Sequence, residues 1–188
     1  NTTGDGLVAV GAYCLDANTT GGSNTAVGHS AMTANTTGAQ NVAVGTNALD
    51  ANTTVSNITA VGYNALTANT TGAENVAVGA NSAVANTTGG QNTAIGSNSF
   101  GANTTGENNT AIGTYALYAN TTASNNTAVG RDTLLTNTTG ASNTAVGKDA
   151  LRASNASSCT AIGTDALTAN TTGASNTAVG TESLAANT

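Results

Sequence analysis

Apolar residues recur along the chain at a fixed spacing. Each unit contains a short apolar run, such as Val42-Ala43-Val44, that ends in glycine and is followed four residues later by leucine or another apolar residue. The spacing between these glycines is seventeen residues, except for one of sixteen that ends at Gly163. The glycines are Gly11, Gly28, Gly45, Gly62, Gly79, Gly96, Gly113, Gly130, Gly147, Gly163 and Gly180. The chain is therefore a tandem array of eleven units that read N-T-T-G-x-x-N-T-A-V-G-x-x-A-L-x-A.

A unit of this length predicts one fold class. Helical repeats need about 33 to 47 residues and a propeller blade about 40, so seventeen residues fit one turn of a parallel β-solenoid. We therefore expect an all-β β-roll of eleven coils, each with two or three short strands. The glycine after the apolar run and the Asn-Thr-Thr-Gly segment supply two corners. Coils about 4.8 Å apart would form a rod about 50 Å long.

Stacking of the coils places equivalent residues in ladders along the rod. We expect two apolar ladders inside, one of Val or Ile before the glycine and one at the leucine position, with asparagine ladders beginning Asn18, Asn35 and Asn52 sharing amide hydrogen bonds. The Val/Ile ladder is Val10, Val27, Val44, Val61, Val78, Ile95, Ile112, Val129, Val146, Ile162 and Val179. The other is Leu15, Met32, Leu49, Leu66, Ala83, Phe100, Leu117, Leu134, Leu151, Leu167 and Leu184.

Alanine precedes Val or Ile in every unit, as at Ala43, Ala60, Ala77, Ala94, Ala111 and Ala128. Strand alternation places this alanine on the face opposite Val/Ile. Two interpretations stay open. Either the alanine points outward against the backbone of another chain, which would make these residues an interface, or it fills a thin interior.

Composition limits the partners. Only 6% of the 188 residues are charged, the net charge is −6, and Arg131, Lys148 and Arg152 are the basic residues. Nucleic acid requires clustered basic residues, so we do not expect it as a partner. No apolar stretch approaches the roughly 20 residues of a membrane-spanning helix. We interpret residues 1–188 as a single array and expect it to be a segment of a longer fibre.

Few residues carry reactive chemistry. His29 is the single histidine, and we expect neither catalysis nor a cofactor. Cys14 and Cys159 lie nine units apart, too far for a disulfide in a straight rod. Four acidic residues share one repeat position in successive units: Asp132, Asp149, Asp165 and Glu182. Such a column either holds a cation or is screened by the neighbouring Arg131 and Lys148.

The Asn-Thr-Thr segment is also an N-glycosylation sequon. The possible sites include Asn18, Asn35, Asn52, Asn69, Asn86, Asn103, Asn120, Asn137 and Asn170. In a glycosylating source, sugars would line one edge of the rod. The alternative is that these residues serve turns and ladders.

The segments Asn41-Val42-Ala43-Val44-Gly45-Thr46-Asn47-Ala48 and Leu7-Val8-Ala9-Val10-Gly11 resemble the head repeats of trimeric autotransporter adhesins, which read close to N-S-V-A-I-G-x-x-S/A. Phage and virus fibres carry similar repeats. The family unit is shorter and lacks the Asn-Thr-Thr-Gly segment. The resemblance implies a left-handed β-roll, three chains packed side by side, a surface or virion location, and binding to host or matrix ligands.

These patterns favour an extracellular structural or adhesive fibre segment without catalytic activity. We expect it to self-associate, as a lateral trimer, end to end, or both, and to contact a host surface or glycan. The alternative is an ice-binding protein that uses a threonine ladder. That ladder would be Thr3, Thr20, Thr37, Thr54, Thr71, Thr88, Thr105, Thr122 and Thr139.

Overall fold

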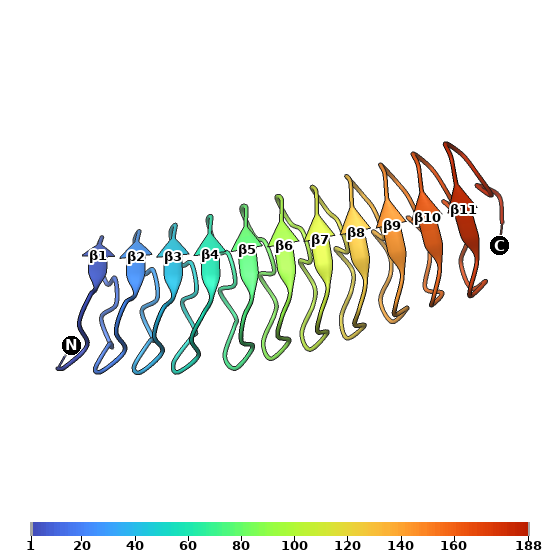
Figure 1. The fold of residues 1–188 in the computed structure, drawn as a ribbon. Coiled ribbons are helices and arrows are strands. Elements are labelled where there is room, and N and C mark those ends of the chain that lie inside the picture. The colour runs from blue at the N-terminus through green and yellow to red at the C-terminus, as the bar shows by residue number, and fades with distance from the viewer. Residues whose placement is uncertain (1, 188) are drawn as a thin grey trace.

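A computed structural model describes residues 2–187 as a parallel β-solenoid, which confirms the predicted fold class. One strand per coil lies beside the next in chain order, from the N-terminal to the C-terminal end of the rod (Figure 1). The described chain has no helix. The strands are β1 (Val8–Val10), β2 (Thr25–Val27), β3 (Val42–Val44), β4 (Thr59–Val61), β5 (Val76–Val78), β6 (Thr93–Ile95), β7 (Thr110–Ile112), β8 (Thr127–Val129), β9 (Thr144–Val146), β10 (Thr160–Ile162) and β11 (Thr177–Val179).

Equivalent residues pair in register from coil to coil, as Ala43 with Ala60. The register is kept across the short unit, where Thr144 pairs with Thr160. The missing residue is absorbed in the bend at 154–158, where the Ser154 hydroxyl accepts a hydrogen bond from the Ala156 amide at 3.1 Å. The short unit is a tightened corner and not a displayed loop.

The glycine that follows each strand turns the first corner, as predicted. Gly79 has a φ of 135°, a region that other residues rarely adopt. A Cβ atom at this position would lie 2.5 Å from the carbonyl oxygen of Gly96 in the next coil. Both the backbone angle and the close stacking of coils therefore require glycine here.

Each coil contains one strand, so the expectation of two or three was wrong. Three non-glycine residues in every coil but the first have positive φ, as do Glu74, Asn81 and Ala83 in the fifth unit, and they interrupt any further extended segment. The coils still exchange backbone hydrogen bonds outside the strands, such as Leu49 N to Ala65 O at 3.0 Å. These bonds join the turns of neighbouring coils much as a sheet joins strands.

The leucine ladder lies inside the solenoid, as predicted, except that Leu184 in the last coil is 52% exposed. Met32, Leu49, Leu66, Phe100 and Leu117 have no exposed surface. A second buried ladder, of alanine or a small polar residue, precedes it by one position, as at Ala48 and Ala65. Large apolar side chains therefore enter the core from the segment after the corner and not from the strand.

Two asparagine ladders complete the interior. In the first, the Asn35 side-chain amide donates to Asn18 Oδ1 at 2.9 Å and to the Gly38 carbonyl at 3.0 Å. In the second, Asn75 Oδ1 accepts the Asn92 backbone N–H at 2.9 Å, and its amide donates to the Gly89 carbonyl at 2.8 Å. The predicted sharing of amide hydrogen bonds is confirmed, and the buried polar groups are largely satisfied.

Ile58 interrupts the second asparagine ladder, and in the same coil a buried acceptor, Asn52 Oδ1, has no hydrogen-bond partner in residues 2–187. In the next coil the equivalent acceptor, Asn69 Oδ1, accepts from the Asn86 amide at 3.0 Å and from the Asn75 amide, at the position of Ile58, at 3.4 Å. We expect Ile58→Asn to be at least as stable as the parent, because an unsatisfied buried acceptor costs about 1–3 kcal/mol. Ile58→Ala, which supplies no donor, should lose about 2–4 kcal/mol in denaturant unfolding. Equal losses for the two variants would contradict the assignment.

Candidate functional site

The inward and outward faces of each strand are the reverse of those expected. Ala43, Ala60, Ala77, Ala94, Ala111 and Ala128 are all buried, with exposed fractions of 0–1%. They point into the solenoid, so their assignment as an interface with another chain is corrected. The other interpretation, that alanine fills a thin interior, is the one that the structure supports. The side chains before and after each alanine therefore point outward.

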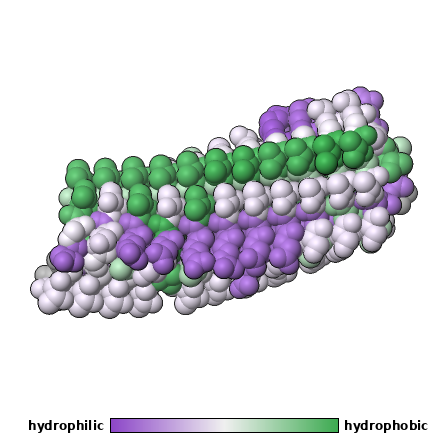
Figure 2. Space-filling view, viewed as in Figure 1, coloured by the Kyte–Doolittle hydropathy of each residue, from purple (hydrophilic) through white to green (hydrophobic). Residues whose placement is uncertain are grey.

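Val and Ile at the third strand position form an outward-facing column, which we call the Val/Ile stripe; five members are exposed and the six on β2–β5, β7 and β8 are half-buried. Its members are Val10, Val27, Val44, Val61, Val78, Ile95, Ile112, Val129, Val146, Ile162 and Val179. Ile95 is 38% exposed and Ile162 is 41% exposed, although both strands have neighbours on each side. Figure 2 shows the stripe as an unbroken hydrophobic band along the rod. The prediction that this ladder is interior was wrong.

A second outward row lies beside the stripe, at the first strand position. It is valine on β1, β3 and β5 and threonine on the other eight strands. Figure 2 shows the alternation of apolar and neutral side chains in this row at the N-terminal end. Every outward strand side chain is thus Val, Ile or Thr, and the face has no charge. A continuous apolar surface of this length is unusual on a monomer and is typical of an interaction site.

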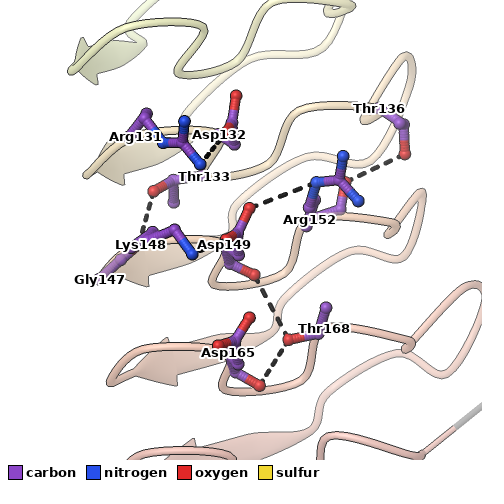
Figure 3. Close-up of polar contacts among 10 residues, drawn as sticks. All are labelled: Arg131, Asp132, Thr133, Thr136, Gly147, Lys148, Asp149, Arg152, Asp165 and Thr168. Atoms are coloured by element: carbon purple, nitrogen blue, oxygen red, sulfur yellow. Dashed lines mark hydrogen bonds and ion pairs between the residues drawn. The ribbon is translucent and has the colours of Figure 1, made fainter.

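The acidic column lies outside this face, on the segment after the corner. Asp132 pairs with Arg131 at 3.1 Å, and Asp149 pairs with Lys148 at 2.9 Å and Arg152 at 3.3 Å (Figure 3). The bond to Asp149 raises the pKa of Lys148. Within residues 2–187 no three acidic, histidine or cysteine side chains gather as metal ligands. Screening by basic neighbours, one of the two interpretations of this column, is supported by the ion pairs at Asp132 and Asp149, whereas in residues 2–187 no ion pair reaches Asp165 or Glu182.

The same column has left-handed backbone at each residue, including a φ of 57° at Asp149 and at Asp165. Asn and Asp tolerate this conformation better than most residues, and the column contains asparagine at Asn47, Asn64 and Asn81. Backbone geometry therefore accounts for the residue type at this position without a metal.

The Asn-Thr-Thr sequons are not accessible in the folded coil. Asn18, Asn35, Asn52, Asn69, Asn86, Asn103, Asn120, Asn137 and Asn170 have exposed fractions of 0–1%. Their amide nitrogens donate inside the coil, as Asn86 does to the Gly89 carbonyl at 2.9 Å and to Asn69 Oδ1 at 3.0 Å. A glycan on this nitrogen would have to displace those bonds and enter the core. The turn-and-ladder interpretation of these residues replaces the glycosylation sites.

The cysteines are free, as predicted. Cys14 packs partly buried beside the core, and burial raises the pKa of its thiol. Cys159 is buried at the asparagine position of the second ladder. Neither thiol lies on the Val/Ile stripe, so the stripe carries no reactive group.

No family model, curated protein or solved structure matches the chain. A search of the described residues for a helix that is long and apolar enough to cross a membrane finds none. A rod of stacked coils with continuous backbone and amide ladders is consistent with a structural role.

Proposed function

We propose that the chain is a segment of an extracellular structural and adhesive fibre in which three copies pack laterally through the Val/Ile stripe. The observation that carries the proposal is the outward-facing stripe itself, which is half-buried to exposed and runs through all eleven strands without a charged residue. Burial of apolar surface contributes about 25 cal/mol per Å². A stripe about 50 Å long therefore provides a large favourable term for association of parallel rods.

Three copies suit a stripe that is narrow and straight. Around a common axis each stripe contacts both of the others, so all three are buried and the assembly closes. The outward threonine and valine row then lies at the flank of each contact. The adhesin-like repeat supports the same number of chains and a surface or virion location. We assign the fibre no catalytic role.

Mass in solution tests the proposal. Light scattering of the parent at micromolar concentration should give three times the chain mass. The double variant Ile95→Asp and Ile112→Asp should shift the protein to monomer, with at least a 100-fold weaker association, because two carboxylates per chain would be buried without partners. The far-ultraviolet spectrum should stay β-rich, since both side chains point away from the interior.

The matched control adds the same charge elsewhere. Thr88→Asp with Thr105→Asp places two carboxylates on exposed residues in the bends, and it should leave the trimer intact. A monomeric parent would overturn self-association. If that monomer also showed thermal hysteresis, the stripe and its threonine row would be an ice-binding face. The Thr-Thr row first considered for ice binding lies in bends and not on the flat strands.

A further inference from the structure

One cleft on the rod departs from the repeat. It is open, has a volume of about 380 Å³, and lies on the segments that follow β7 and β8, not on the strand face. It is lined by Tyr115, Tyr118, Ala119, Asp132, Leu135 and Thr136. These segments come from two successive coils, so the cleft follows the direction of stacking. Burial of the Val/Ile stripe and occupation of this cleft involve different residues.

Two exposed tyrosines form one wall of the cleft. Their rings meet edge to face with centroids 5.4 Å apart, and they are 40% and 41% exposed. No hydrogen bond joins either phenol to another residue in the part of the chain that the structure describes. In the preceding coil the equivalent residues are Asn98 and Gly101. The aromatic pair is therefore a local addition and not part of the ladders that hold the coils together.

The Tyr118 ring occupies the space left by the missing side chain at Gly101. A Cβ atom at Gly101 would lie 2.8 Å from Tyr118 Cε2, so any other residue would push the ring away from the rod. The ring packs on the backbone of the neighbouring coil and is held in place while part of it stays exposed.

The lining of the cleft is mostly apolar, and its one charged residue, Asp132, is neutralised by Arg131, which lies outside the lining. Arg131 Nη2 contacts Asp132 Oδ2 at 3.1 Å, with side-chain exposures of 60% and 16% (Figure 3). Thr136 donates its hydroxyl to the Arg152 carbonyl at 3.1 Å. The hydrogen-bonding groups of the lining are thus the Asp132 carboxylate, the Thr136 hydroxyl and the two phenols. A cationic ligand would compete with Arg131, and an anionic one would be repelled by Asp132.

We propose that this cleft binds a neutral pyranose ring of a carbohydrate. The C–H face of a sugar ring is weakly positive and packs on the negative face of an aromatic ring. Its hydroxyls both donate and accept hydrogen bonds, so they suit the Asp132 carboxylate and the two phenols. The volume lies at the lower end of the range of about 300–1,000 Å³ for small-molecule sites. The proposal rests on the adhesive part of the proposed function, but binding does not require association of the chains.

The test uses cellobiose and N,N′-diacetylchitobiose, two disaccharides of neutral pyranoses. Saturation-transfer NMR on the full chain should show transfer to ring protons, with a Kd of about 1 mM, as expected for a shallow site. The chain has four tyrosines and no tryptophan, so tyrosine fluorescence reports the same titration. Tyr118→Ala should weaken binding at least tenfold. The control Tyr63→Ala removes an exposed tyrosine outside the cleft and should leave the Kd unchanged.

Three results would overturn the inference: no transfer from either disaccharide up to about 50 mM, equal loss in both tyrosine variants, or binding of tetramethylammonium in place of sugar. The titration is repeated on the Ile95→Asp and Ile112→Asp variant. Sugar binding by a protein that proves monomeric would retain the cleft and reject lateral packing. A trimer that binds neither disaccharide would retain lateral packing and reject the cleft as a sugar site.

Discussion

Ala94→Leu is expected to destabilise the coil by about 3 kcal/mol or more, at or beyond the upper end of the usual cost of overpacking. Ala94 is 1% exposed on the central strand β6 and pairs in register with Ala77 and Ala111, which are themselves fully buried. A leucine has no adjacent space into which to turn. The measurement is the midpoint of denaturant unfolding, followed by circular dichroism.

The matched control is the same substitution one residue later. Ile95→Leu changes a side chain that points outward, and it should alter stability by less than about 1 kcal/mol, in line with the modest span of strand preferences. If Ala94→Leu instead dissociated an oligomer and left unfolding unchanged, alanine would face outward. The pair of variants therefore measures directly which side of the strand is the interior.

The seventeen-residue period was sufficient to predict the class of fold, the chain-order stacking, the glycine corner, and the leucine and asparagine ladders. Each of these follows from stacking equivalent residues on one another. The period could not predict the inward face of the strand, because alternation separates two faces without saying which is inside. Volume suggested Val/Ile, since larger apolar residues are usually buried.

The coil is too thin for Val or Ile to point inward, so alanine occupies the inward face of the strand. Leu117 and Asn120 fill the interior from the segments after the corner, and both are fully buried, which leaves room for only a methyl group at Ala111. The sequence contained one signal of this: alanine is constant at its position, whereas Val and Ile exchange. The Tyr115–Tyr118 cleft was not predicted. Two tyrosines three residues apart do not indicate a cleft unless it is known that one of the rings packs against Gly101 of the preceding coil.

The left-handed backbone conformation of the leucine ladder was also not predicted. Leu66 has a φ of 49°, a left-handed conformation that costs roughly 1–2 kcal/mol for most residues. Its equivalents Leu49 and Leu117 have φ values of 54° and 50°. Sequence preference argues against leucine in such a conformation. Burial of the side chain offsets the strain, because a fully buried leucine gains about 1.5–3 kcal/mol relative to an exposed one.

This balance between side-chain burial and backbone strain predicts how substitutions of Leu66 change stability. Leu66→Ala should lower the free energy of unfolding by about 2–5 kcal/mol, because it opens a cavity in a ladder whose stacked neighbours cannot close it. Leu66→Gly removes the same side chain but relieves the left-handed strain. It should therefore be no less stable than Leu66→Ala, the reverse of the usual order for glycine and alanine.

Asn64, two residues earlier, provides the control on the same coil. It has a φ of 54°, accepts from the Asn47 amide at 3.1 Å and donates to Asn81 at 3.3 Å, and it is only partly buried. Asn64→Gly keeps the favourable backbone but loses both side-chain hydrogen bonds and should cost about 1 kcal/mol, whereas Asn64→Ala adds left-handed strain and should cost about 1 kcal/mol more. Denaturant unfolding of the four variants separates side-chain burial from backbone strain. If Leu66→Gly fell well below Leu66→Ala, the left-handed backbone would not be a source of strain, and the ladder would be held by packing alone.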